Sequence, residues 1–218
     1  MKVVFEEIIA GDVDAVRERV AKDARVVGAV AGAAPKKYAA QSPLQVAYRH
    51  GEFEIAALLL THGADPNYIE HPDREPWAMP VLHHAIKAAV SRSRWLRPTW
   101  REEEPWQLRN TADRADAAHA ALLVLLEAGA DVHALDSYGN SSLGRAALDA
   151  RDVLPRYRHN DPDWVDPKPL NPELVEDLTR VFRALKARGA DPHRSERDLG
   201  ASLLEFYGAE PVARFLDA

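Results

Sequence analysis

The chain has 218 residues, a formal net charge of −6 and no cysteine. The lack of cysteine excludes a disulfide framework and any thiolate metal site, and the negative charge argues against nucleic acid or an anionic membrane as partner. The apolar runs are too short to cross a bilayer, and the acidic first twenty residues do not resemble a secretory signal. We therefore expect a cytoplasmic protein that begins at its native methionine.

The first predicted elements lie before residue 41. Phe5 to Ala10 is predicted to form a short helix, and Asp12 is predicted to cap a second helix over Val13 to Lys22. The alanine- and glycine-rich stretch from Val26 to Gln41 is predicted to be a loop with an exposed tip at Lys36–Tyr38.

The next stretch, Ser42 to Asn67, has the pattern of one complete helix–turn–helix unit. Ser42 is a favourable helix N-cap, and Pro43 lies at the first helical position, where its missing N–H costs nothing. Gly51 ends the first helix because glycine tolerates a positive φ, and Gly63 ends the second. Neither helix is long enough to be stable alone, so their apolar faces require neighbouring copies.

Copies of this unit recur along the chain. The triplet Gly-Ala-Asp occurs at 63–65, 129–131 and 189–191, each time after an apolar helical run. The unit resembles the ankyrin repeat, which has a turn, two antiparallel helices and a period of about 33 residues. The residues that carry the resemblance are Ser42-Pro43-Leu44, Ala47, Gly51, Leu58-Leu59-Leu60, Gly63-Ala64-Asp65, Leu82-His83, Ala85, Leu143, Ala146 and the turn Asp136–Ser141.

This resemblance implies an all-α repeat solenoid, an ankyrin-like stack of about five helix–turn–helix units in a single domain over residues 1–218. The expected units are an N-terminal cap repeat (1–40), repeat two (41–79), repeat three (80–140), repeat four (141–200) and a C-terminal cap (201–218).

Spacing predicts long insertions between the two helices of repeats three and four. From Leu44 to Gly63 is 19 residues, whereas Leu82 to Gly129 is 47 and Leu143 to Gly189 is 46. The surplus falls at about 91–116 and about 151–172. Both inserts should emerge opposite the turns and lie close enough to touch, because neighbouring helices pack about 8–10 Å apart.

The inserts contain four of the five tryptophans, with many arginines. Trp, Tyr and Arg dominate binding hot spots. The candidate partner-binding residues are Arg94, Trp95, Arg97, Trp100, Arg101, Trp106, Arg156, Tyr157 and Trp164 in the inserts, and Tyr68 and Tyr138 on the side of the turns. A competing interpretation is that the tryptophans only pack as a lid over the helix ends.

Catalytic and metal-binding patterns are weak. Adjacent residues on a helix point about 100° apart, so His83 and His84 are poorly placed to bind one metal ion. His83 occupies the position of the ankyrin family's usual turn-supporting histidine, and His133 and His193 recur at one position of successive turns. Because no phosphate-binding glycine loop, G-x-S-x-G or H-E-x-x-H occurs, we expect neither an enzyme nor a cofactor.

The resemblance implies a non-catalytic protein–protein interaction module, expected to be monomeric on its own. The arginine- and alanine-rich composition indicates a bacterial source, and decorated repeats favour an immunity protein or antitoxin that neutralises a toxin or effector. The alternative is an enzyme or small-molecule binder that uses a cleft between the inserts, walled by Trp100, Arg101, Tyr157 and His159.

Overall fold

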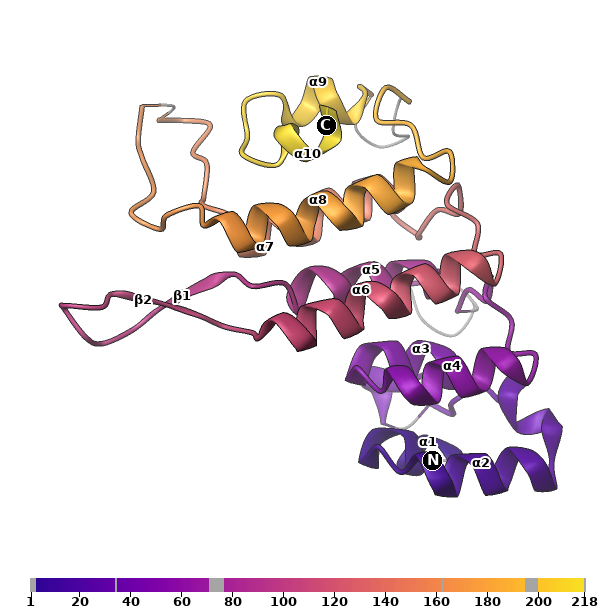
Figure 1. Cartoon of the computed structure of the whole chain (residues 1–218). Coiled ribbons are helices and arrows are strands. Elements are labelled where there is room, and N and C mark those ends of the chain that lie inside the picture. The colour runs from indigo at the N-terminus through magenta and orange to yellow at the C-terminus, as the bar shows by residue number, and fades with distance from the viewer. Residues whose placement is uncertain (1–2, 34, 71–76, 162, 195–199, 218) are drawn as a thin grey trace.

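The computed structural model describes residues 3–33, 35–70, 77–161, 163–194 and 200–217. Figure 1 shows helices stacked along one direction, from the N-terminal pair to the C-terminal pair. The helices are α1 (Val3–Ala10), α2 (Val13–Lys22), α3 (Pro43–His50), α4 (Phe53–Thr61), α5 (Val81–Ser91), α6 (Ala112–Glu127), α7 (Ser142–Val153), α8 (Pro172–Lys186), α9 (Leu203–Tyr207) and α10 (Ala213–Asp217). Two 3₁₀ turns, η1 (Ala24–Gly28) and η2 (Lys36–Tyr38), follow α2.

The helices form two layers. In one layer α1, α3, α5 and α7 pack successively against one another, and in the other α2, α4, α6 and α8 do the same. Each odd-numbered helix up to α7 also packs against the even-numbered helix that follows it, which is the arrangement of stacked helix–turn–helix units. The end of the stack beyond α8 is covered by α9 and α10.

The predicted helix ends near the N-terminus are confirmed. The Asp12 carboxylate caps α2 by accepting from the backbone N–H of Ala15 at 3.0 Å. Ser42 and Gln45 form a capping box at the start of α3, because each side chain accepts from the other residue's backbone N–H. Gly51 ends α3 with a left-handed φ of +81°.

One apolar core runs through the stack from α1 to α10. Its largest fully buried side chains include Phe5, Tyr48, Phe182 and Phe215. The Tyr48 hydroxyl donates to the carbonyl oxygen of Ala121 at 3.0 Å, which ties α3 to α6, and burial raises the pKa of Tyr48. Because each layer covers the next, the short helices are stabilised by their neighbours.

The turns that follow the second helices are also bonded to one another. The Asn67 side chain donates to the carbonyl of Gly129 at 3.0 Å and accepts from the N–H of Asp131 at 2.7 Å. His133 takes the equivalent place in the next turn, and its Nε2 lies beside Gly189. These contacts fix the spacing of successive units at this edge.

The prediction of an exposed tip at Lys36–Tyr38 is wrong for Tyr38. Tyr38 is 3% exposed, and its hydroxyl lies 2.8 Å from Nε2 of His50. The physical reason is that the backbone N–H of Ala31 donates to the carbonyl of Gln41 and its carbonyl accepts from the N–H of Ala40, which folds the loop back onto α3. Of the three residues of the predicted tip, Lys36 and Lys37 are exposed.

The segment between α5 and α6 departs from the all-α prediction. Two short antiparallel strands, β1 (Leu96–Pro98) and β2 (Trp106–Leu108), form a hairpin. In addition, α6 already begins at Ala112 and α7 continues to Val153, so the segments that link the helices are shorter than the predicted inserts. We define the hairpin segment as 92–111 and the second linking segment as 154–171.

Candidate partner-binding surface

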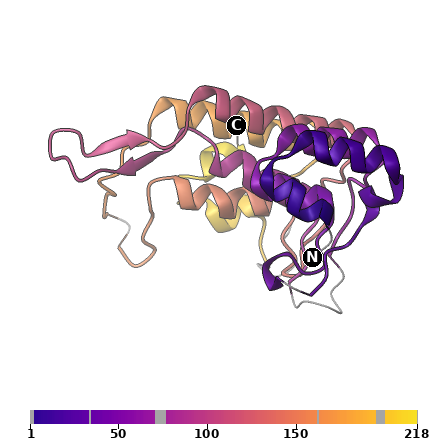
Figure 2. The same ribbon diagram turned by 90° about the horizontal axis from the view of Figure 1, so that it is seen from below.

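The hairpin segment and the second linking segment emerge on the same side of the stack, away from the turns (Figures 1 and 2). A cleft of about 450 Å³ lies between them, which we call the insert cleft. Trp95, Trp106 and Trp164 line it together with Arg156 and other cationic side chains. The expectation that these two segments lie close together is therefore confirmed.

The base of the hairpin is anchored to α8 by Arg94. Its backbone N–H and its guanidinium donate to the Asp177 carboxylate at 2.8–3.0 Å, and the guanidinium also donates to Glu176 at 2.7 Å. The side chains of Arg94 and Asp177 are only 16% and 4% exposed. These hydrogen bonds, first of all the one to Asp177, raise the pKa of Arg94.

The same ion pair lowers the pKa of Asp177. Burial raises the pKa of Asp177, but hydrogen bonds from Arg94 and Arg180 outweigh this effect, so its net pKa lies below the usual value. The carboxylate therefore stays charged and holds two guanidinium groups. Arg94 was predicted to bind a partner, and its guanidinium is already occupied within the chain.

Trp95 connects the two linking segments. Its ring is half-buried against the core, its Nε1 donates to the carbonyl of Ser91 at 3.1 Å, and the Lys168 ammonium lies 5.3 Å from the ring centroid. Burial lowers the pKa of Lys168, whose ammonium also donates to the carbonyl of Val153. Trp95 thus packs as a lid residue, as the competing interpretation expected.

The second linking segment is ordered by Asp166 and an arginine–tryptophan stack. The Asp166 carboxylate accepts from the backbone N–H groups of Arg156 and Lys168 at 2.6 and 2.9 Å. The Arg158 guanidinium lies 3.8 Å from the Trp164 ring centroid, so Trp164 is partly covered from outside. The Arg156 side chain is exposed at the rim of the insert cleft.

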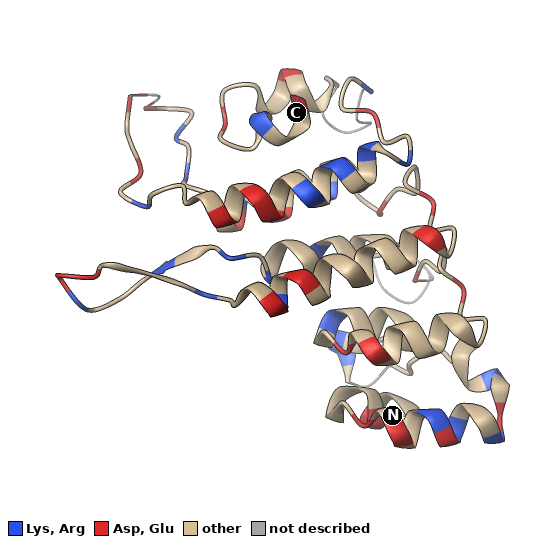
Figure 3. Cartoon of the chain, in the orientation of Figure 1, with Lys and Arg blue, Asp and Glu red and all other residues tan. Residues whose placement is uncertain are grey.

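The hairpin tip is the most exposed aromatic site. Trp100 is 88% exposed, and the Arg101 guanidinium lies 5.6 Å from its ring centroid. The acidic run Glu102–Glu104 follows immediately, and Figure 3 shows it at the end of the hairpin with basic residues along the arms. The tip therefore combines a large exposed apolar surface with charges of both signs.

The remaining predicted residues lie in three different places. Arg97 pairs with Gln107 across the hairpin, and Tyr157 stacks edge-on against His159 with ring centroids 5.0 Å apart. On the side of the turns, Tyr68 donates its hydroxyl to the carbonyl of Ala40 at 2.7 Å. There too, Tyr138 is 56% exposed and lies 4.4 Å from the Trp77 ring. Binding roles for these residues stay predictions.

The pocket wall predicted for the small-molecule alternative is wrong. Trp100 and Arg101 lie at the hairpin tip, whereas Tyr157 lines a separate hollow near Glu210. His159 is bound to Glu210 at 3.0 Å. These side chains do not surround one cavity, because the hairpin extends away from the stack (Figure 2).

Sequence reasoning missed a groove across the layer that contains α3, α5 and α7. We call it the basic groove. It has a volume of about 560 Å³ and is lined by six cationic side chains: Lys36, Lys37, Arg49, Lys87, Arg92 and Arg145. One available signal was that Arg49 and Lys87 follow the first-helix leucines, Leu44 and Leu82, at equal distance. The overall charge of −6 obscured it.

The comparison with protein families bears on the first complete unit. Residues 41–71 match the family model of the Ankyrin repeat. This match supports an ankyrin-repeat protein, and ankyrin repeats generally mediate protein–protein interaction without catalysis. A search of curated proteins finds no match to this chain.

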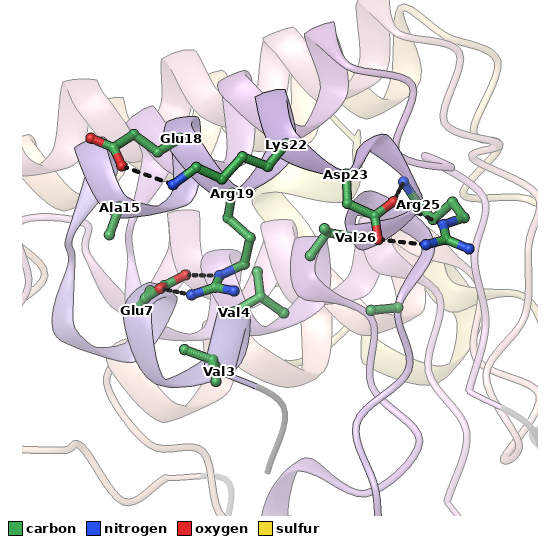
Figure 4. A pocket seen from close by; sticks show the side chains of 11 residues that line it. Val3, Val4, Glu7, Ala15, Glu18, Arg19, Lys22, Asp23, Arg25 and Val26 are labelled. Carbon is green, nitrogen blue, oxygen red and sulfur yellow. Dashed lines mark hydrogen bonds and ion pairs between the residues drawn. The ribbon is translucent and has the colours of Figure 1, made fainter.

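A further hollow lies at the N-terminal end of the ankyrin-like stack. It measures about 770 Å³ and is bordered by α1, α2 and η1 (Figure 4). The charged side chains around it are paired with one another, as Glu7 with Arg19, Glu18 with Lys22, and Asp23 with Arg25. The six charged side chains that line this hollow are therefore all engaged in ion pairs with one another.

The two adjacent histidines of α5 are both buried. Nε2 of His84 lies 3.2 Å from the Glu70 carboxylate, and Nδ1 of His83 lies 3.8 Å from Asp136. Burial, assisted by the charge of Arg145, lowers the pKa of His83 to about 3. Among the described residues, neither a cluster of three metal-ligating side chains nor a helix suited to spanning a membrane is found.

Proposed function

We propose that this chain is a non-catalytic protein-binding module that contacts its partner through the hairpin tip and the insert cleft. The observation that carries the proposal is Trp100, which is 88% exposed at the end of a hairpin that extends beyond the helical stack. An exposed tryptophan next to an arginine is a typical binding anchor, because it contributes a large apolar area together with directional polar groups.

The base of the hairpin supports this role. Arg94 is bonded to Asp177, and the Asn110 side chain donates to the carbonyls of Ser91 and Ser93 at 3.0 and 2.9 Å. A hairpin held at its base loses less conformational entropy when its tip is bound, so more of the contact energy remains for affinity.

We propose further that the partner is a toxin or effector protein that this chain neutralises. Two successive helix pairs carry long linking segments that share one side, which gives one specialised surface rather than a repeated one. A specialised surface favours a single dedicated partner. The insert tryptophans that stay accessible provide the contact area.

The test compares three forms of the protein as bait in a lysate of the source cell: the wild type, Trp100→Ala with Arg101→Ala, and Tyr138→Ala. We expect the tip variant to lose the partner while Tyr138→Ala retains it. Calorimetry with the purified partner should show a loss of about 2–4 kcal/mol for the tip variant, as for central hot spots.

The neutralisation role is tested by co-expression. The captured partner alone should inhibit cell growth, and co-expression of the wild type should restore it. Capture of many unrelated proteins, none of them toxic, would refute the dedicated-partner proposal. If the tip variant bound the partner with unchanged affinity, the partner would instead be assigned to the side of the turns.

The second candidate is a small-molecule site in the insert cleft. Its volume of about 450 Å³ is within the usual range for ligand pockets, about 300–1,000 Å³. This candidate predicts that cell metabolites change the tryptophan fluorescence of the wild type and leave that of Trp106→Ala less affected. No response in the wild type would exclude it.

A further inference from the structure

Four cations of the basic groove make no ion pair with a carboxylate in the part of the chain that the structure describes. Lys36, Lys37 and Lys87 are exposed, and no ion pair to a carboxylate is found for them or for Arg92 among the described residues. Arg92 is instead half-buried, with its guanidinium 5.4 Å from the Phe53 ring centroid. These cationic groups face a common hollow and repel one another, so a bound anion would reduce the electrostatic repulsion between them.

The carboxylates of Glu70, which lines the groove, and Asp149, which binds Arg145, are both buried and already accept hydrogen bonds. Glu70 is 3% exposed and accepts from the backbone N–H of Met79 and from the side chain of Gln41. Asp149 is 4% exposed and holds Arg145 by two hydrogen bonds. Among the described residues that line the groove, the exposed charged side chains are therefore all positive.

The effect of this charge is visible on a neighbouring histidine. Burial is the first cause that lowers the pKa of His50, and the positive charges of Lys37, Arg49 and Arg92 lower it further. Glu52 acts in the opposite direction but does not reverse the shift. The region around the groove thus disfavours an additional cation and favours an anion.

The groove continues toward the insert cleft. A hollow of about 500 Å³ beside it shares Arg145 with the basic groove, and shares Arg151 and Arg156 with the insert cleft. Two carboxylates line this hollow: the Glu210 side chain is 3% exposed and paired with Arg151 at 2.7 Å, whereas Asp152 is exposed. Cationic side chains therefore recur from the basic groove through this hollow to the insert cleft, with Asp152 as an exposed acidic residue among them.

We infer that the basic groove binds an acidic segment of the partner protein in extended form. This inference rests on the proposed protein-binding function and specifies the chemistry of the partner. Carboxylates of the segment would pair with the exposed cations, and an apolar side chain of the segment would contact Trp77, which is 37% exposed and lines the same groove.

A peptide fits this path better than a nucleic acid. A phosphate backbone carries charge at every residue and would be repelled by the overall charge of −6. A peptide can place its acidic residues only where cations lie, and its apolar residues elsewhere. Charge complementarity of this kind mainly provides specificity and fast association.

The probe is a short fluorescein-labelled peptide of alternating glutamate and leucine, titrated in fluorescence anisotropy against the full chain. The test variant is Arg49→Glu with Lys87→Glu, and both side chains are exposed. The matched control is Lys22→Glu with Arg194→Glu, which makes the same charge change at exposed positions outside the groove. Circular dichroism verifies that each variant is folded.

We expect the groove variant to bind the peptide about tenfold more weakly, or about 1.4 kcal/mol, and the control variant to bind it within about twofold of the wild type. The glutamine version of the peptide should bind poorly to all forms. If the groove variant fails to fold, Arg49→Gln with Lys87→Gln replaces it, with a loss about half as large in free energy expected.

Three results would overturn the inference: equal loss in both variants, equal binding of the glutamine peptide, or tighter binding of a single-stranded oligothymidylate that displaces the peptide. The last result would assign the groove to nucleic acid. Trp100→Ala with Arg101→Ala should leave peptide binding unchanged. Peptide binding therefore tests the groove inference alone, and partner binding by the tip variant tests the proposed function.

Discussion

The ion pair between Arg94 and Asp177 gives the sharpest test of how the hairpin is attached. Arg94→Ala removes three side-chain hydrogen bonds, two to Asp177 and one to Glu176. Asp177 remains in α8, 4% exposed, with Arg180 as its remaining guanidinium partner at 2.7 Å. The variant therefore leaves a buried carboxylate only partly neutralised.

The magnitude follows from burial. Removing one partner of a buried ion pair costs about 3–5 kcal/mol, because the other charge stays desolvated. Arg180 and the backbone N–H of Arg94 still donate to Asp177, so we expect the lower end, about 3 kcal/mol. Glu176 is 63% exposed, and its share should be at most about 0.5 kcal/mol.

The assay is urea denaturation at pH 7, with Glu176→Gln as the control that removes only the exposed partner. The pKa of Asp177 is lowered in the folded state, so its contribution to stability is present above the unfolded pKa and is lost as the pH falls through the folded value. The difference between wild type and Arg94→Ala should therefore persist at pH 7 and shrink below about pH 4.

A destabilisation by Arg94→Ala of less than about 1 kcal/mol would refute this reasoning, because the pair would then behave as an exposed one. A large cost that did not change at low pH would indicate that packing of the arginine stem, rather than its charge, anchors the hairpin.

The remaining predictions concern stability. Because the folded-state pKa of His83 is lowered to about 3, the unfolded chain binds a proton below about pH 6.5 that the folded chain does not. Stability should therefore fall on acidification by up to about 1.4 kcal/mol per pH unit, and His83→Gln should flatten this slope in urea titrations between pH 7 and 5. Gly63→Ala forces an alanine into φ +84° in open space and should cost about 1 kcal/mol. Gly51→Ala has a similar φ and also displaces Arg92, whose Nη2 would lie 2.1 Å from the new Cβ, so it should cost more, about 2 kcal/mol. Equal thermal shifts for the two glycine variants would contradict this account.

Local signals in the sequence predicted the elements whose causes are local. The helix over Val13–Lys22, the Ser42 cap and the Gly51 end depend on a few adjacent residues, and all three are present. The surplus residues between the two helices of repeats three and four likewise indicated segments that lie outside the stack. A period of known length exposes any insertion, because the helices on either side must still meet their neighbours.

Contacts between distant residues could not be predicted in the same way. Tyr38 is buried because the loop before α3 pairs with itself, and Arg94 is buried because Asp177 lies far along the chain. The strands of the hairpin were missed because they are three residues each and β1 contains arginine and proline. The basic groove combines three helices and two loops, so its charge is a property of the stack rather than of any one segment.

The basic groove attracts an acidic segment only at short range. At physiological salt the field of a surface charge decays over about 8 Å, so a distant partner is influenced weakly and the groove is felt only near contact. The hairpin tip projects furthest from the stack, and its Trp100 can meet the partner before the groove does (Figure 1). If the tip binds first, the acidic segment then reaches the groove as an intramolecular step with a high effective concentration. This order predicts that added salt accelerates dissociation more than it slows association, since the groove contributes after encounter. A steep salt dependence confined to the association rate would instead place the groove first.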